Sequence, residues 1–229
     1  MNAPNGCYRS RKTIGPRLSR CRVTLRSRRF GLLAMVIQPV RIAGRWRDGR
    51  ALDAHTVSST YLGEDEFGHA QFDTKRSPLG ELLYRLKYRA DQTVIPEITD
   101  AAASFVRNWR PETELLVPVP PSRERALQPV LVIGASLAEL LGVEFCPGCV
   151  TRTREVAQLK DVFDYDARWR LLDGLGDVDE SKVAGRKGLL FDDLFRSGAT
   201  MNAITGALYD QGRASDVYAL TLTRTRSKQ

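Results

Sequence analysis

Two adjacent carboxylates, followed closely by a polar turn that contains glycine, are the residues of this chain best suited to chemistry. Asp192 and Asp193 follow the apolar run 188–191, and the turn Ser197-Gly198-Ala199-Thr200 comes shortly after them. The pattern predicts a buried strand that ends at the acid pair, then a turn, then a helix that begins at Thr200. In open α/β sheets, ligands bind outside the carboxyl ends of the strands, so both groups would face a ligand.

The turn and the acid pair suit different parts of one ligand. Gly198 lets the backbone approach a phosphate closely, and the start of a helix offers N–H groups that have no partner within the helix. The carboxylates repel that phosphate and instead suit neutral hydroxyls, or a metal ion, beside it. A ribose 5-phosphate has a phosphate on one side and vicinal hydroxyls on the other. The alternative is an ordinary strand–turn–helix with a solvated acid pair.

These residues resemble a known family. The runs 189–193 and 197–200 are similar to the loop that binds phosphoribosyl pyrophosphate (PRPP) in type I phosphoribosyltransferases, and most similar to the ComF (competence protein F) group among them. The resemblance covers roughly residues 79–224 and is strongest at 189–200. It implies an α/β fold, the type I phosphoribosyltransferase fold, with a mostly parallel sheet flanked by helices. It also implies transfer of a phosphoribosyl group from PRPP to an unidentified nitrogen acceptor, with loss of pyrophosphate.

The resemblance assigns roles to named residues. Asp192 and Asp193 are the catalytic candidates and would accept hydrogen bonds from ribose hydroxyls. The 5-phosphate loop would consist of Arg196, Ser197, Gly198, Ala199 and Thr200. Arg196 departs from the small polar residues that are usual in this turn, so it either binds the phosphate or points outward. Mg²⁺ would arrive bound to the substrate, and the resemblance assigns no metal ligand to the protein.

A second loop follows the apolar strand predicted at 115–119. By its position it resembles the family's pyrophosphate loop, with Pro120, Ser122 and Arg123 as its members. Such a loop must direct cations and amides at a leaving group that gains negative charge. The alternative is a proline-rich connector with surface arginines. A third segment, 151–160, is either a loop that closes over the substrate or a solvated surface loop.

The charge and apolar patterns divide the chain into three parts. Residues 1–30 hold nine Lys or Arg and no acid, although the chain as a whole has a net charge of +8. We expect a basic, disordered arm over 1–36, which is either a tail, with at most a weak nucleic-acid contact, or sequence upstream of a start at Met35. Residues 37–76 are expected to form a small β-rich cap, or hood, and 77–229 the core with its N-terminal helices. The apolar run 30–37 is too short to cross a membrane, so no membrane partner is expected.

Alternating strand and helix signals predict a mostly parallel sheet covered on both faces. Ser77 and Pro78 begin a helix with Leu79, Leu82, Leu83 and Leu86 on one face, and Pro96 begins a second. The segment 83–89 resembles one that ComF-like proteins have ahead of the core, but we interpret Arg85 and Lys87 as part of a solvated basic face. The other predicted elements are strands at 40–42, 56–62, 143–150, 189–192 and 217–222, and helices ending at Gly142, over 165–172 and over 200–211.

The remaining patterns bear on compartment and on competing functions. Cys146 and Cys149 have metal-ligand spacing without a second close pair, so we interpret them as structural in a reduced, cytoplasmic protein. No Walker-type phosphate loop occurs, which argues against a P-loop nucleotide hydrolase. The main alternative to an enzyme is a non-catalytic regulator that binds PRPP or a nucleotide, or a DNA-uptake accessory protein. A homo-oligomer is compatible with either function.

Overall fold

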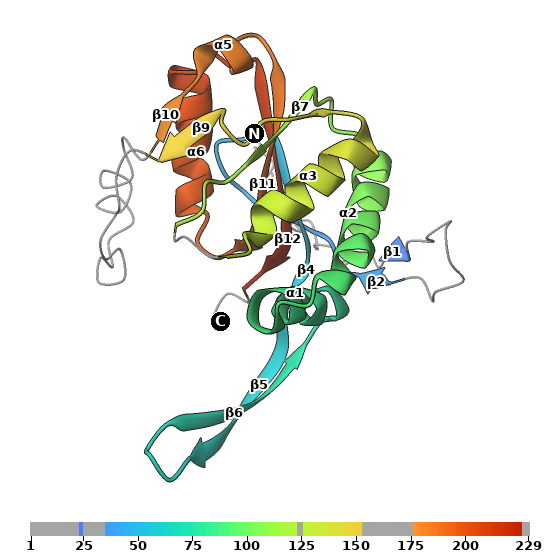
Figure 1. The fold of residues 1–229 in the computed structure, drawn as a ribbon, viewed down its shortest axis with the longest axis vertical. Helices are drawn as coiled ribbons and strands as arrows, with labels where there is room; N and C mark the ends of the chain where they lie inside the picture. Colours follow the sequence, from blue (N-terminus) through green and yellow to red (C-terminus); the bar gives the residue numbers. More distant parts are fainter. Residues whose placement is uncertain (1–22, 25–34, 123–125, 153–175, 226–229) are drawn as a thin grey trace, which may run out of the picture.

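The computed structural model describes residues 23–24, 35–122, 126–152 and 176–225, and its centre is a six-stranded sheet (Figure 1). The strands lie in the order β3 (Val40–Arg41), β4 (Asp48–Ala54), β12 (Asp216–Arg224), β11 (Lys187–Phe195), β7 (Leu115–Pro118) and β8 (Glu144–Phe145). Every neighbouring pair is parallel except β3 and β4. The predicted α/β class with a mostly parallel sheet is confirmed.

Helices cover both faces of this sheet. Successive residues of a strand point to opposite faces, so Leu189 and Phe191 pack in one apolar cluster while Leu190 packs in the other. The first cluster lies under α1 (Pro78–Arg89), α2 (Ile95–Trp109) and α3 (Pro129–Leu141), with the short 3₁₀ turn η1 (Gln92–Val94) between α1 and α2. The second lies under α6 (Ala199–Asp210) and α5 (Glu180–Val183). Within the described residues no helix has the length and apolar character needed to cross a membrane.

The first core helix forms as its sequence predicts. Ser77 is the N-cap, and its Oγ accepts a hydrogen bond from the Gly80 N–H at 3.0 Å. Pro78 occupies the first turn, where its missing N–H costs nothing. The four leucines at helical spacing are all buried, and they are Leu79, Leu82, Leu83 and Leu86. The helix therefore turns one apolar face to the sheet.

The N-terminal third is divided differently from the prediction. The stretch 37–76 was expected to be one β-rich cap, but β3 and β4 belong to the central sheet, where β4 pairs in parallel with β12. Only β5 (Thr56–Glu64) and β6 (Ala70–Arg76) project from the body, as an antiparallel hairpin (Figure 1). In the arm expected to be disordered, β1 (Val23–Thr24) pairs with β2 (Val36–Ile37); residues 1–22 and 25–34 lie outside the described ones. Ala51 and Leu52 are fully buried, which explains why β4 joins the core despite its polar sequence.

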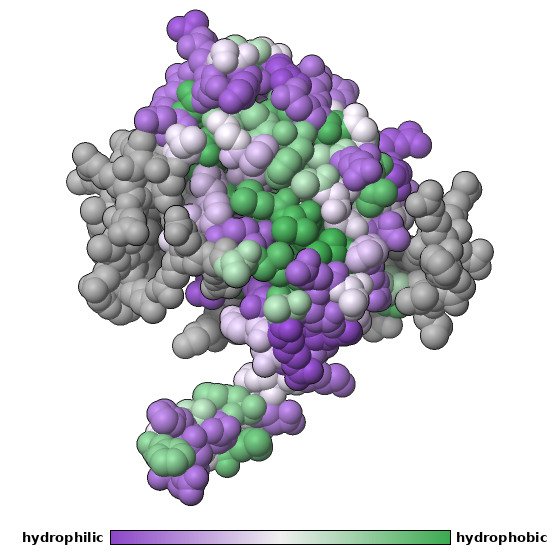
Figure 2. Space-filling model, in the orientation of Figure 1, coloured by the Kyte–Doolittle hydropathy of each residue, from purple (hydrophilic) through white to green (hydrophobic). Residues whose placement is uncertain are grey.

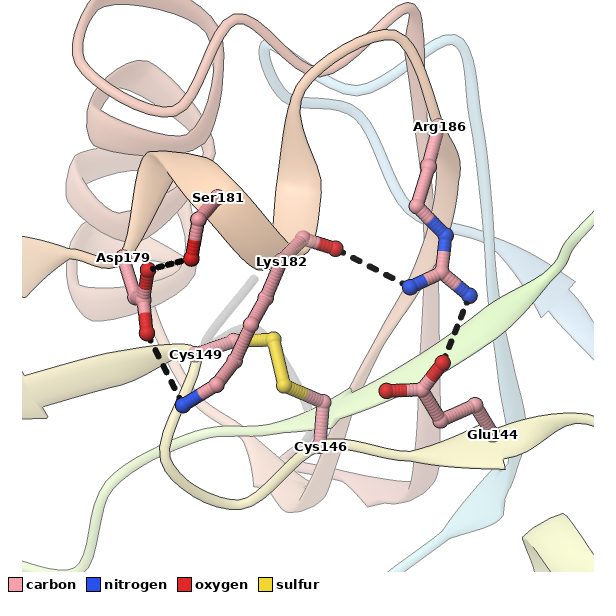
Figure 3. The surroundings of a disulfide bond; sticks show 7 residues. All are labelled: Glu144, Cys146, Cys149, Asp179, Ser181, Lys182 and Arg186. Carbon is pink, nitrogen blue, oxygen red and sulfur yellow. Dashed lines mark hydrogen bonds and ion pairs between the residues drawn. A yellow bond between two sulfur atoms is a disulfide. The ribbon is translucent and has the colours of Figure 1, made fainter.

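The strand predicted at 143–150 is interrupted. Glu144 and Phe145 form β8, and Val150–Arg152 form β9 in a separate two-stranded sheet with β10 (Gly176–Val178). Cys146 and Cys149 are joined by a disulfide across the intervening turn (Figure 3), so the expectation of a reduced pair is wrong. Proline and glycine between the cysteines favour a turn over a continuous strand.

Charged residues lie near the disulfide, although both of its cysteines are buried. Lys182 Nζ lies 2.8 Å from Asp179 Oδ2, and Arg186 contacts Glu144 Oε2 at 2.8 Å (Figure 3). Both half-cystines are buried. The predicted helix over 165–172 and most of the predicted closing loop, 153–160, lie outside the described residues.

One close approach fixes the hairpin base against α1. A Cβ added at Gly80 would lie 2.3 Å from the backbone oxygen of His55 and 3.1 Å from Ser77 Oγ. Glycine is therefore required there by space. We expect Gly80→Ala to lower the free energy of unfolding by about 2 kcal/mol, because the overpacking exceeds the roughly 1 kcal/mol that alanine gains in a helix.

Denaturant unfolding of Gly80→Ala beside Gly188→Ala checks this expectation. The control places its Cβ no closer than 3.9 Å to Val117 Cγ2. Equal stability of the two variants would contradict the close packing of α1 on the hairpin base.

Candidate functional site

The acid pair lies where the central sheet opens. Strand β7 pairs with β11 only as far as Pro118 opposite Phe191, so it ends just before Asp192. On its other side β11 continues beside β12 to Phe195. The strand therefore runs through both acids, whereas we predicted that it ends at Asp192. The end of β7 leaves the two carboxylates next to the loop that follows Pro118.

Lys87 of α1 contacts this pair directly. Its Nζ lies 2.6 Å from Asp193 Oδ2, and both side chains are only 13% exposed. The interpretation of Lys87 as part of a solvated face is therefore wrong. Arg85 does point away and pairs with Asp91 at 2.6 Å. The sequence signal for Lys87 was its place in the segment 83–89, but helical spacing alone could not show that α1 brings it to the acid pair.

The environment keeps Asp192 partly protonated at neutral pH. Burial, and to a lesser extent the negative charge of Asp193, raise the pKa of the Asp192 carboxyl to about 7. The Asp193 N–H, which donates to Asp192 Oδ1 at 2.8 Å, and the charge of Lys87 oppose this rise. The two carboxyl groups of this site therefore differ in their surroundings. Asp193 is paired with Lys87, whereas Asp192 has a pKa close to neutral pH.

His55, at the base of the hairpin, lies behind the acid pair. Its Nδ1 is 3.2 Å from Thr223 Oγ1, and that hydroxyl donates to the backbone oxygen of Asp193 at 3.1 Å. Since the hydroxyl has one hydrogen, Nδ1 of His55 must be the donor to it. Burial lowers the pKa of His55, and the charges of Lys87 and Arg76 lower it further. Sequence reasoning placed no histidine near the site, because β4 was not expected in the central sheet.

The predicted phosphate loop leads into the start of helix α6 (Ala199–Asp210). Helix α6 begins at Ala199, one residue before the predicted start, and Gly198 precedes it in the left-handed region with φ of 76°. Gly198 has no side chain that could cap this helix, and the N–H of Ala199, its first residue, donates to Ser197 Oγ at 3.4 Å. Asn202, which was not predicted, accepts from the Arg45 N–H at 2.8 Å and donates to the Gly198 oxygen at 3.0 Å. That buried amide fixes the loop against the β3–β4 connection.

Two adjoining cavities bring these groups together. One, of about 210 Å³, is lined by Lys87, Asp192, Asp193, Thr200, Gln128, Pro129, Val130 and the run 119–122. The other, of about 160 Å³, is lined by Asp192 and the run 194–201. Asp192 and Thr200 line both, so the two cavities are neighbours at these residues. The described residues contain no group of three or more His, Cys, Asp and Glu placed to hold a metal ion.

Nearly all of the predicted site residues line these two cavities. Pro120 and Ser122 line the first one with both acids, and the five phosphate-loop residues, Arg196 to Thr200, line the second. Arg196 thus borders the cavity. Arg123 lies outside the described residues. The sequence prediction therefore identified the positions that surround this space, but missed Lys87, His55 and Asn202.

Comparisons with known proteins agree with the resemblance seen in the sequence. The chain is similar to competence protein ComFC of Bacillus subtilis (strain 168), with 27% identity over 154 residues that cover 66% of this chain and 62% of that protein. This match confirms the predicted resemblance to the ComF group. The chain spans less than two thirds of the length of that relative. No protein-family model matches the chain.

Several solved structures are also similar in overall arrangement. One is adenine phosphoribosyltransferase from Saccharomyces cerevisiae complexed with an imino-altritol bisphosphate and adenine, at TM-score 0.41 and 15% identity, covering 72% of this chain and 85% of that one. Another is adenine phosphoribosyl transferase from Trypanosoma brucei in complex with AMP, pyrophosphate and ribose-5-phosphate, at TM-score 0.37 and 15% identity, covering 82% and 86%.

The raised pKa of Asp192 has a measurable effect on stability. Its value of about 7 in the folded protein lies above the ordinary 3.8, so ionisation of Asp192 destabilises the fold above pH 7, and the penalty is relieved as pH falls from 7 towards 3.8. We expect Asp192→Asn to raise the free energy of unfolding by up to about 4 kcal/mol at pH 8, and by less at pH 5.

Thermal unfolding at several pH values measures this difference. Asp177→Asn is the matched control, because Asp177 is exposed on β10. An Asp192→Asn protein no more stable than wild type at pH 8 would mean that the carboxyl is not desolvated.

Proposed function

We propose that this protein binds PRPP across these two neighbouring cavities and transfers its phosphoribosyl group to a nitrogen acceptor with loss of pyrophosphate. The observation that supports this most is that Asp192 and Thr200 line both cavities. One cavity is lined by the start of α6, where N–H groups have no partner within the helix, and the other is lined by two carboxylates beside a loop. A ligand with a 5-phosphate, ribose hydroxyls and a second phosphate group fits that sequence of contacts.

Each group would have a distinct role. The backbone N–H groups at the start of α6 would hold the 5-phosphate, with Gly198 allowing the close approach. Asp192 and Asp193 would accept hydrogen bonds from the ribose hydroxyls. The loop with Pro120 and Ser122 would face the pyrophosphate. Lys87, beside Asp193 in the same cavity, would place a positive charge near the leaving group as its negative charge develops.

Mg²⁺ belongs to the substrate in this proposal. Carboxylate oxygens are ligands that Mg²⁺ accepts, and the ion usually reaches such sites on substrate phosphates. The acid pair in the first cavity is a suitable donor set for a Mg²⁺–PRPP complex. The ion would neutralise charge on the departing pyrophosphate. The protein side of the site needs only to bind, orient and desolvate.

A second candidate function is PRPP binding without transfer, in a regulator or a DNA-uptake accessory protein. The observation that favours it is the similarity to a relative named as a competence protein. Both candidates use the same cavity, so the tests separate binding from turnover.

Calorimetry with Mg²⁺ and PRPP tests the binding step. We expect wild type to bind, and Asp192→Asn/Asp193→Asn to bind at least about 10-fold more weakly, because hydrogen bonds to charged groups are worth roughly 1.5–3 kcal/mol each. Asp177→Asn should bind as wild type does. If folded wild-type protein does not bind PRPP, the proposed function is wrong. If PRPP binds but no purine, pyrimidine or amine yields pyrophosphate, the non-catalytic function is favoured.

Substitution of Gly198 tests whether the two ends of the ligand bind at different places in the site. An alanine Cβ at residue 198 would lie 2.8 Å from the Phe195 ring, at a φ that side chains rarely adopt. We expect Gly198→Ala to weaken binding of ribose 5-phosphate about 10-fold or more, while inorganic pyrophosphate binds nearly as before. Gly188→Ala is the control in the same strand–turn–helix unit. Equal weakening for both ligands would argue against a phosphate site at α6.

A further inference from the structure

Asp193 lies at a gap in the pairing of the central sheet. Strand β7 pairs with β11 only as far as Phe191. On the other side, the register of β11 with β12 includes Asp192 and Leu194 but passes over Asp193. Within the described sheet, Asp193 therefore has no register partner on either neighbouring strand, and the position of its backbone depends on other contacts.

Two side chains supply the contact that the strands leave out. Thr223 Oγ1 donates a hydrogen bond to the backbone oxygen of Asp193 at 3.1 Å, and His55 Nδ1 lies 3.2 Å from the same Oγ1. Because the hydroxyl hydrogen is used by Asp193, Nδ1 of the ring carries a hydrogen and donates it to Oγ1. Thr223 is fully buried, so its hydroxyl cannot turn to water instead. The ring of His55 therefore keeps the hydroxyl hydrogen directed at Asp193.

The neighbouring threonine shows that burial on β12 is not enough to form such a bond. Thr221 lies two residues before Thr223 and is also fully buried. Within the part of the chain that the structure describes, its Oγ1 has no hydrogen-bond partner. Of these two threonines, the one that faces His55 is the one with hydrogen bonds.

The backbone of His55 is fixed on two sides at the base of the β5–β6 hairpin. Its N–H donates to the backbone oxygen of Arg224 at 2.8 Å. Its own oxygen lies against α1, where a Cβ added at Gly80 would be 2.3 Å away. The hairpin meets the body at this base (Figure 1), where the visible surface is largely hydrophilic (Figure 2). The imidazole therefore projects from backbone that two other elements hold in place.

The same helix holds the other end of Asp193. Lys87 of α1 contacts the Asp193 carboxylate at 2.6 Å, whereas Thr223 contacts the backbone oxygen. Lys87 and Asp193 both line the larger cavity. Asp193 is thus fixed at its backbone and at its side chain, and a shift of either would move the carboxylate within the cavity.

His55 acts on Asp193 as a neutral donor. Burial lowers the pKa of its ring, and the charges of Lys87 and Arg76 lower it further, whereas the charge of Asp193 opposes the shift. The ring is therefore uncharged at pH 7. Its effect on Asp193 comes from one hydrogen bond in series with another.

We propose that His55 is a positioning residue of the ligand site, which fixes the peptide group of Asp193 through Thr223 and so directs the Asp193 carboxylate in the cavity. His55 lines neither of the two described cavities, so it acts through Thr223 and not on the ligand. The ligand that meets the carboxylate is the one given by the proposed function, on which that part of the inference rests. The positioning itself is a property of the free protein.

Hydrogen exchange of the free chain tests the positioning. We expect His55→Leu and Thr223→Val to raise amide exchange at residues 192–195 at least about 3-fold, because each removes a link between β12 and Asp193. His55→Asn should stay near wild type, since its amide places an N–H donor as many bonds from Cα as Nδ1 does. Thr221→Val is the matched control, because it removes a buried hydroxyl that has no partner among the described residues.

Binding of Mg²⁺–PRPP tests the consequence for the ligand site. His55→Leu and Thr223→Val should each weaken binding about 3- to 10-fold, the loss expected for one neutral hydrogen bond, while His55→Asn and Thr221→Val bind nearly as wild type does. In the double variant His55→Leu/Thr223→Val, the loss should match that of Thr223→Val alone, because the two residues act in series. Two independent structural defects would add instead.

Three results, each obtained with variants that are folded by circular dichroism, would overturn the inference. They are exchange at residues 192–195 that His55→Leu leaves unchanged, a His55→Asn variant no better than His55→Leu, and binding losses that add in the double variant. If wild type binds no PRPP, the proposed function fails, and the exchange measurement alone decides whether His55 positions Asp193.

Discussion

The electrostatic balance at Asp192 and Asp193 is the constraint on which the site depends. Two carboxylates share a buried corner at which a sheet strand has ended, and one lysine from a different layer compensates one of them. The second carboxyl is left with a pKa of about 7. A fold selected only for stability would place apolar groups here, because desolvated charge without a full set of partners costs free energy. A ligand with hydroxyl donors would supply the missing partners.

Several elements hold Asp192, Asp193 and the neighbouring turn in place. Helix α1 must bring Lys87 within reach, and it does so by packing four leucines against the sheet. Thr223 of β12 holds the Asp193 backbone, and His55 holds Thr223. Asn202 ties the turn at Gly198 to the loop before β4. The site is therefore assembled from segments separated by more than a hundred residues, and each is fixed by contacts that are not themselves part of the ligand space.

Sequence reasoning found the local parts of this assembly and missed the long-range ones. Helix α1 could be predicted from Ser77, Pro78 and the leucine spacing, because caps and periodicity act within a few residues. The acid pair and its turn could be found for the same reason. Lys87 could not, since its exposure depends on which layer α1 joins. The place of β4 in the sheet was also missed, because Asp48–Ala54 has few apolar residues and is buried by its neighbours. The break after Phe145 was hidden because Val143–Val150 is apolar enough to suggest one strand.

The lengths of the outer strands have a consequence for how copies of this protein can meet. Both edges of the central sheet are two-residue strands, β3 and β8, so the sheet offers little template for another chain to add to. The longer edges among the described residues belong to the hairpin, whose register shifts near Val57 and Leu62 interrupt its regular pairing. Open-ended strand addition is thus obstructed at each exposed edge. A long regular edge would offer the continuous row of unpaired backbone groups that strand addition needs, and neither edge of the central sheet provides one.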